Sequence, residues 1–208
     1  MPLRSVLGYA MFCVGGLAVA FSGGRYAVGT WRQQEARQTW DEAEARAVVA
    51  LARRSGGVDG RNPAPIVTGS PVARLLIPRL SLDEVVMEGV DADALNAGPG
   101  HLPGSAFPGE RGNAVISAHR DRHFTRLGEI DVGDTVLTES GSLRTAWVVI
   151  AKRVIDADAP ALFRTKDATL TLTTCWPIRY VGTAPERLLV TAKPITPEPG
   201  SFASVGSN

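Results

Sequence analysis

The segment TLTLTTC, residues 169–175, decides the fold prediction for this chain. Threonine and leucine alternate with the period of two that is typical of a β-strand. Leu170 and Leu172 therefore share one face, which we expect to supply the core contacts, while Cys175 lies on the opposite face. Trp176-Pro177 follows at once and ends the strand. The cysteine is thus predicted at the end of a strand.

A second strand is predicted after this one. Alternation resumes at Arg187 and continues to Ala192, after a turn that contains Gly182 and Pro185. If the two strands pair as a hairpin, the end of the first and the start of the second lie at the same rim. Cys175 and Arg187 then become neighbours in space.

His119 occupies a comparable position, since it follows the apolar run 114–118 and begins the polar turn HRDRH. Strand ends often carry functional side chains on a rigid scaffold. Taken singly, a cysteine, a histidine or an arginine is more often structural or solvated. Together, Cys175, His119 and Arg187 suit nucleophilic chemistry. A thiolate attacks, a histidine exchanges its proton, and a guanidinium donates hydrogen bonds to an oxyanion.

The surrounding region, from Val72 to Ile195, consists of short apolar or alternating runs separated by glycine and proline. Several short strands at modest spacing predict an all-β barrel or sandwich. The runs are ARLLIPRL, NAVISAH, DTVLTES, RTAWVVIAKRVI, ATLTLTTC and RLLVTAKPI.

The amino terminus predicts a membrane segment within residues 1–30. The sequence is uncharged from Val6 to Gly24, close to the ~20 residues needed to span a bilayer, and aromatic side chains follow it. A cleaved signal peptide is the alternative, because Ala18-Val19-Ala20 has the form of a cleavage site. Cys13 is interpreted as a small lipid-facing hydrophobe. Arginines flank both ends, so charge alone does not indicate the orientation.

Residues 31–54 predict an amphipathic helix, with Ala36, Trp40 and further apolar residues at alternating spacings of four and three. We interpret it mainly as a stalk, and docking of its Trp40 face on the next domain is the alternative. A linker is predicted at 55–71, a catalytic domain at 72–196, and a disordered tail at 197–208.

The overall composition excludes several other classes. The chain has 208 residues, with 22 Lys and Arg against 21 Asp and Glu, so no nucleic-acid partner is indicated. Three histidines and two cysteines are too few, at these spacings, for a structural zinc site or a disulfide scaffold. No cofactor is expected. The acidic residues that precede Cys175 do not have the spacing of an EF-hand calcium loop: Asp156, Asp158 and Asp167.

The sequence Thr171-Leu172-Thr173-Thr174-Cys175, followed by Arg187, resembles the TLxTC and downstream arginine signature of the sortases, the bacterial cysteine transpeptidases. Within that family it looks most like the class D and Gram-negative types. The resemblance extends in order over nearly all of 72–195. Its other motifs are Leu76-Ile77-Pro78, Gly100 to Ser105, Pro108-Gly109, Gly112-Asn113, Ser117 to Asp121, Gly133-Asp134 and Val181 to Arg187.

The resemblance implies an eight-stranded β-barrel in which Cys175 is the nucleophile, His119 the acid and base, and Arg187 the oxyanion and substrate-positioning residue. His101 resembles a recurrent family position and is expected to be structural. The resemblance also leaves calcium as an alternative, because acidic residues near Asp156, Asp158 and Asp167 hold calcium in some sortases. His123 is predicted to be a polar surface residue. The candidates for the substrate groove are Ser117, Ala118, Thr173, Thr174 and Trp176.

The predicted function is that of a membrane-tethered sortase. It would cleave an LPxTG-like sorting signal of an exported protein, hold it as a thioester, and pass it to an amine of a cell-wall peptide or protein. The catalytic domain is expected on the outer side of the cytoplasmic membrane. The alternatives are a simple thiol protease, an L,D-transpeptidase, and a non-enzymatic membrane-tethered barrel that binds proteins.

Overall fold

The computed structural model describes residues 11–17, 19–20, 24, 28, 31–42, 67–141, 143–159 and 163–195. The tail predicted at 197–208, the second half of the predicted helix and most of the predicted linker lie outside these residues. Helical conformation is found at 11–17 and 31–42. Among the described residues, no helix is both long enough and apolar enough to cross a membrane. Cys13 lies exposed on the first helical segment as a free thiol.

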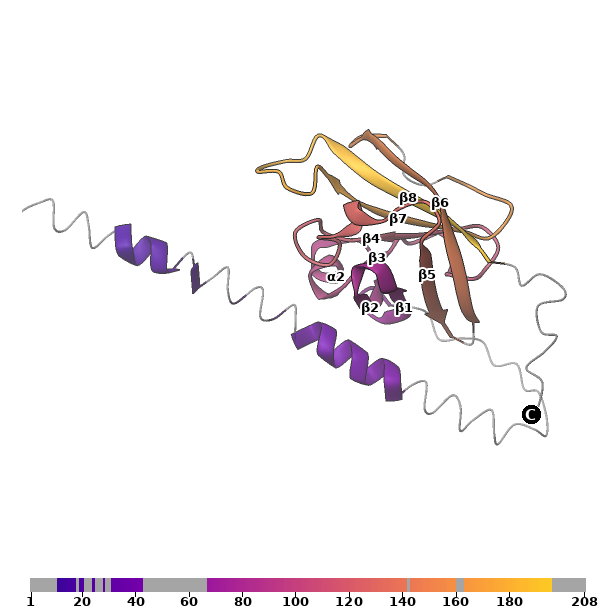
Figure 1. The fold of residues 1–208 in the computed structure, drawn as a ribbon. Coiled ribbons are helices and arrows are strands. Elements are labelled where there is room, and N and C mark those ends of the chain that lie inside the picture. Colours follow the sequence, from indigo (N-terminus) through magenta and orange to yellow (C-terminus); the bar gives the residue numbers. More distant parts are fainter. Residues whose placement is uncertain are drawn as a thin grey trace, which may run out of the picture.

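The strands close into a single barrel in the order β1-β2-β3-β4-β7-β8-β6-β5 (Figure 1). Their bounds are β1 (Pro71–Ile77), β2 (Leu82–Glu88), β3 (Gly100–His101), β4 (Asn113–Ser117), β5 (Thr135–Ser140), β6 (Leu143–Asp156), β7 (Thr169–Trp176) and β8 (Glu186–Pro194). The β2–β3 and β4–β7 pairs are parallel and the other pairs are antiparallel. The prediction of an eight-stranded β-barrel is confirmed, and closure of the sheet excludes a sandwich.

Strand β7 contributes its leucine side chains to the core inside the barrel. Leu170 and Leu172 are fully buried and belong to the main core, as the sequence predicts. Trp147 of β6 is the largest buried side chain, and its indole nitrogen donates to Thr138 Oγ1 at 2.8 Å. Phe124 is also buried in this core. A filled interior of this kind makes the barrel a rigid support for its rim.

Three short helices complete the described fold: η1 (Pro78–Leu80), α2 (Ala92–Ala97) and η2 (Leu127–Glu129). The carboxylate of Asp91 starts α2 by accepting hydrogen bonds from the backbone of Asp93 and Ala94. The sequence analysis did not predict α2, β2 or β3. Six residues are too few to show a helical period, and β3 has only two residues.

The helix at 31–42 packs against β2 and α2. Ala36 is buried with Val85, Met87, Ala94 and Ala97, and Trp40 packs against the same group. The stalk interpretation is therefore wrong for this part of the helix, and the docked alternative is correct. The physical reason is that the small alanines on both helices allow close approach, so the apolar stripe is buried on the barrel instead of facing solvent.

Candidate active site

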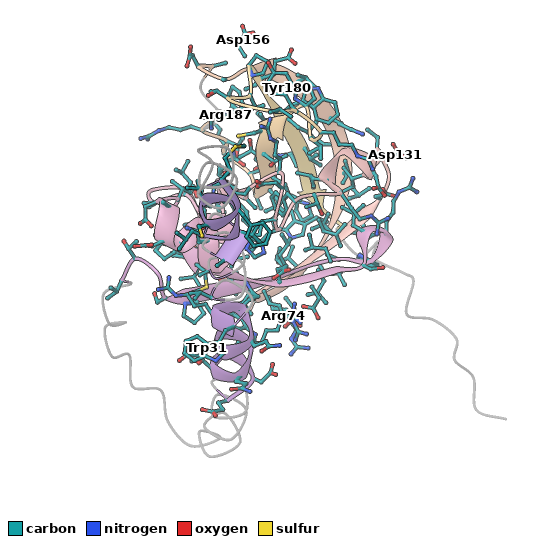
Figure 2. All side chains as sticks on the ribbon, turned by 90° about the vertical axis from the view of Figure 1, so that its left-hand side faces the viewer. Trp31, Arg74, Asp131, Asp156, Tyr180 and Arg187 are labelled. Carbon is teal, nitrogen blue, oxygen red and sulfur yellow. The ribbon has the colours of Figure 1, made fainter. Side chains whose placement is uncertain are left out.

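Strands β7 and β8 bring the predicted nucleophile and arginine together. Cys175 and Arg187 are directly opposed Cα partners in the antiparallel ladder. Both side chains are exposed at this rim, and the thiol is free. The hairpin prediction is confirmed. In Figure 2, Arg187 lies towards the same end of the molecule as Tyr180, and Trp31 lies towards the opposite end.

His119 reaches the same rim from the end of β4, which runs parallel to β7. Two hydrogen bonds fix the residue before it. The Ala118 backbone nitrogen donates to the carbonyl oxygen of Thr173 at 3.1 Å, and Thr174 Oγ1 donates to the carbonyl oxygen of Ala118 at 2.7 Å. The threonines before Cys175 thus position the residue before His119. The distance between the thiol and the imidazole is therefore determined by strand pairing, which fixes side-chain positions more precisely than an unsupported loop does.

A pocket of about 290 Å³ contains all three of these side chains. Four of the five predicted groove residues also line it, namely Ser117, Ala118, Thr173 and Thr174. Trp176 does not. It is partly buried against the main core, and its ring lies so close to Gly128 that a Cβ there would sit 3.1 Å from Trp176 Cζ3. Trp176 therefore supports the rim from the core side.

The rest of the pocket lining is apolar and was missed by the sequence analysis. The four residues come from three different parts of the chain: Val90, Leu95, Leu102 and Val115. No local signal distinguishes them from ordinary core residues, because only the closed barrel brings them beside Cys175. These four side chains give the pocket an apolar wall, in addition to the reactive side chains of Cys175, His119 and Arg187.

Thr173 adds an unpaired polar atom to this pocket. Its Oγ1 is buried and has no hydrogen-bond partner among the described residues. A buried hydroxyl without a hydrogen-bond partner lowers the free energy of unfolding, typically by about 1–3 kcal/mol, so such groups commonly bind a ligand or water. Thr173 is therefore suited to bind a polar group of a substrate.

Burial is the main cause that lowers the pKa of His119 below its ordinary value of 6.5. The charge of Asp121 opposes this effect, whereas Arg122 and His123 lower the pKa further. The imidazole is half-buried and therefore mainly neutral near neutral pH. In this state it can accept a proton from a thiol.

Arg120, the residue after His119, holds the loop between Cys175 and Arg187. Its guanidinium donates to the carbonyl oxygens of Pro177 at 3.1 Å, Tyr180 at 3.1 Å and Gly182 at 2.8 Å. It also lies over the Tyr180 ring, with 5.6 Å from Cζ to the ring centroid. One side chain thus ties the His119 turn to the β7–β8 loop.

His101 does not line this pocket and is fully buried. Its Nδ1 is 2.7 Å from Glu88 Oε2, and its Nε2 is 2.9 Å from both the Ala106 carbonyl oxygen and Ser105 Oγ. A carbonyl oxygen can only accept, so Nε2 carries a proton and cannot take one from Ser105. This serine, histidine and glutamate cluster is therefore structural, in agreement with the prediction for His101.

The prediction for His123 is wrong. Its side chain is only 8% exposed, and its Nδ1 lies 3.6 Å from Glu84 Oε1. The turn after His119 folds back against β2, so a residue that the sequence pattern assigns to a polar surface turn is covered. In the described part of the chain, no three His, Cys, Asp or Glu residues cluster closely enough to hold a metal ion, and this includes the aspartates considered for calcium.

Comparison with known proteins agrees with this geometry. Residues 75–195 match the family model of the sortase domain. The chain is 32% identical over 188 residues to Sortase D of Bacillus subtilis, covering 87% of this chain and 94% of the relative. Among solved structures, Sortase C1 of Streptococcus agalactiae has a TM-score of 0.57 at 31% identity, covering 63% of this chain and 70% of that one. The Sortase D5 transpeptidase of Clostridium perfringens has a TM-score of 0.62 and covers 82% of this chain and 99% of that chain; at 23% identity it supports the fold alone.

A closed barrel with a cysteine, a histidine and an arginine at one rim defines a cysteine-dependent transpeptidase. The chain belongs to the sortase family. This membership excludes the L,D-transpeptidase and the non-catalytic binding module as alternatives.

Proposed function

We propose that this sortase cleaves an LPxTG-like sorting signal in an exported protein through a thioester on Cys175 and transfers it to an amine. The observation that carries the proposal is the direct opposition of Cys175 and Arg187 in a pocket that also contains His119. These groups supply the nucleophile, the proton carrier and the donor for an oxyanion.

In the first half-reaction, the Cys175 thiolate attacks the scissile carbonyl carbon and forms a C–S bond. The carbonyl oxygen becomes an oxyanion, and the Arg187 guanidinium stabilises it with hydrogen bonds that are strongest in the transition state. Protonated His119 gives its proton to the leaving nitrogen as the C–N bond breaks. The products are a thioester and a free amine on the released peptide.

In the second half-reaction, an acceptor amine attacks the thioester carbonyl carbon. His119, now neutral, takes a proton from the attacking nitrogen, the C–S bond breaks, and the thiolate is restored. A new amide bond results. If water replaces the amine, the same steps end in hydrolysis, which is the thiol-protease alternative.

The rest of the pocket fits an extended peptide with an apolar side chain. The apolar wall that includes Leu95 and Val115 would bury such a side chain, and Thr173 Oγ1 would bind a backbone polar group. Ser117 lies on the same lining. This combination supports an LPxTG-like signal, whose leucine and proline are apolar.

The proposal also places the enzyme on the outer side of the cytoplasmic membrane, tethered by its amino terminus. The supporting observations are the uncharged sequence 6–24 and the free thiol of Cys175, which has no nearby cysteine to oxidise with among the described residues. The acceptor amine would then belong to a cell-wall peptide or another surface protein.

The decisive experiment is capture of the acyl-enzyme. The full chain is incubated with an LPxTG-containing peptide, with and without a glycine-based amine, and analysed by intact mass spectrometry. We expect a thioester adduct on Cys175 that disappears with the amine and yields a transpeptidation product. An adduct that decays only to the hydrolysed acid would instead support the thiol protease.

A further inference from the structure

Gln33 is the most tightly held side chain of the docked helix. It is 6% exposed, and every polar atom of its amide is used. Its Oε1 accepts from the Val85 backbone nitrogen at 2.9 Å, and its Nε2 donates to the carbonyl oxygens of Val85 at 3.2 Å and Ala97 at 3.0 Å. Ala97 is the last residue of α2. One side chain therefore joins the amino-terminal helix, β2 and the end of α2.

The contact leaves no spare room. A Cβ at Gly98 would lie 2.6 Å from both Gln33 Nε2 and the Val85 carbonyl oxygen, so a glycine there lets the amide and β2 approach the end of α2. The carbonyl oxygen of Ala97 is one of the helix-end acceptors that α2 cannot satisfy internally. Losing the Gln33 amide would leave this buried group without a partner.

The two faces of α2 contact different parts of the molecule. Ala94 and Ala97 pack on the amino-terminal helix through Ala36, whereas Leu95 lines the pocket of Cys175. A second hydrogen bond links the same helix to the His119 turn, since Arg122 Nη1 donates to the Asn96 carbonyl oxygen at 2.9 Å. Any displacement of α2 therefore moves an apolar wall of the substrate groove.

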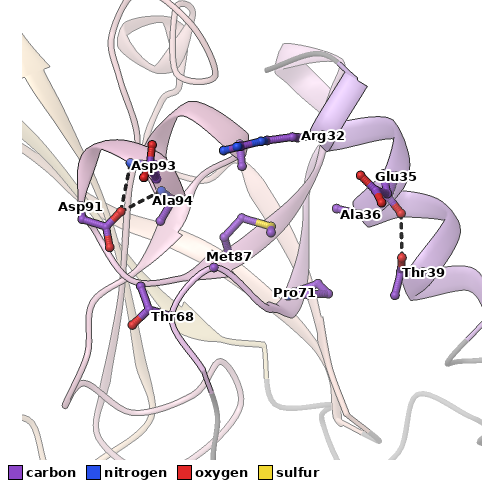
Figure 3. A pocket seen from close by; sticks show the side chains of 12 residues that line it. Arg32, Glu35, Ala36, Thr39, Thr68, Pro71, Met87, Asp91, Asp93 and Ala94 are labelled. Carbon is purple, nitrogen blue, oxygen red and sulfur yellow. Dashed lines mark hydrogen bonds between the residues drawn. The ribbon is translucent and has the colours of Figure 1, made fainter. Parts of the chain in front are cut away.

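Beside this contact, the two helices enclose an open hollow of about 500 Å³ (Figure 3). Met87 and Ala94 lie on its inner side, and Arg32 extends across it from the amino-terminal helix towards α2. The hollow leaves part of the space between the two helices unfilled beside the contact of Ala36 with Ala94 and Ala97, so the hydrogen bonds of Gln33 add to the positioning of α2.

We propose that Gln33 is a positioning residue through which the amino-terminal helix sets the place of α2, and so the affinity of the groove for the sorting peptide. The inference rests on the proposed function of the groove. Gln33 touches none of the reacting groups, so its loss should weaken substrate binding and leave the chemical step intact.

The test compares Gln33→Ala and Gln33→Met with Gln34→Ala in the full chain, using a fluorescence-quenched LPxTG peptide. Gln34 is the neighbouring glutamine and is exposed, so it is a matched control. We expect both Gln33 variants to raise KM on the order of tenfold, a usual coupling between adjacent sites, with little change in kcat. Methionine keeps the length and approximate volume of glutamine but makes none of the three hydrogen bonds of its amide, so it tests their loss even if the alanine variant does not fold.

A double-mutant cycle with Leu95→Ala shows whether the effect passes through α2. We expect the KM effects of Gln33→Ala and Leu95→Ala to be clearly less than additive, because both act on the same wall. An unchanged KM in the Gln33 variants, or fully additive effects, would overturn the inference alone. Absence of any Cys175-dependent turnover in the unmodified chain would overturn the proposed function and the inference with it.

Discussion

Cys175 and Arg187 face each other across the β7–β8 ladder, one at the end of its strand and the other near the start of the next. A Cα pairing of this kind holds two side chains at the same rim whatever the loop between them does. The thiol and the guanidinium are thus positioned by the pairing of two strands, and their placement does not depend on the conformation of the loop from 177 to 185.

The first prediction concerns the guanidinium of Arg187. Arg187→Lys keeps the charge but loses the planar fork of donors that an oxyanion and a peptide carbonyl can share. We expect kcat/KM for the sorting peptide to fall by at least ~10²-fold, as for loss of an oxyanion donor. Arg153→Lys, an exposed arginine on β6, is the control and should be neutral. Near-normal turnover in the Arg187→Lys variant would show that Arg187 acts only as a diffuse charge.

The second prediction separates the two thiols. Cys175→Ala should remove all cleavage and all acyl-enzyme while leaving the thermal unfolding curve almost unchanged. The reason is that the core contacts of β7 come from Leu170 and Leu172. Cys13→Ala, which removes the other free cysteine, should retain full activity. The measurement is peptide cleavage together with intact mass, and residual cleavage above background in Cys175→Ala is the outcome that contradicts the mechanism.

The sequence was sufficient for the strand that carries Cys175 and for its partner. Alternation in 169–175 and 187–192 predicts both strands, and the turn residues Gly182 and Pro185 between them favour a hairpin. The same logic placed His119 at a strand end. These predictions succeed because period-two patterning and strand pairing are local properties, and the site lies on such elements.

The failures share a different cause. His123 is covered by β2, and the amino-terminal helix is docked by Gln33, through contacts between residues far apart in the chain. Leu95 becomes part of the pocket only because α2 is held over the rim. Such positions depend on how the barrel closes, so no local pattern predicts them.

The third prediction concerns the Arg120 contacts with the β7–β8 loop. Arg120→Ala removes the donor to three backbone carbonyls. We expect a loss of about 1–2 kcal/mol in the free energy of unfolding, since several of these bonds are partly exposed. Amide exchange in residues 177–185 should accelerate. Denaturant unfolding and hydrogen exchange measure the two effects.

Arg144→Ala is the matched control for Arg120. Arg144 is exposed on β6 and forms an ion pair with Glu139 of β5 at 3.7 Å, and such exposed pairs contribute about 0–1 kcal/mol. Its removal should leave exchange in the β7–β8 loop unchanged. Equal exchange in Arg120→Ala and the unmodified chain would show that the loop is held by other contacts.

The last prediction follows from the lowered pKa of His119. Turnover needs a thiolate beside an imidazolium, so the rate rises as the thiol loses its proton and falls as the imidazole loses its own. The lowered pKa of His119 makes this competent form a minority near neutral pH, and the pH profile of kcat/KM is a bell whose two apparent pKa values belong to the pair. Asp121 raises the pKa of His119. Asp121→Asn should therefore move the acid limb of the profile to lower pH and reduce the maximum rate. Asp131→Asn is the control, because Asp131 pairs with Arg79 and does not affect the pKa of His119, and it should change neither quantity. Kinetics across the pH range and NMR titration of the His119 ring measure both effects.

Rapid alkylation of Cys175 at pH 5 that persists in His119→Ala would contradict the scheme, because it would show a thiolate stabilised without this histidine.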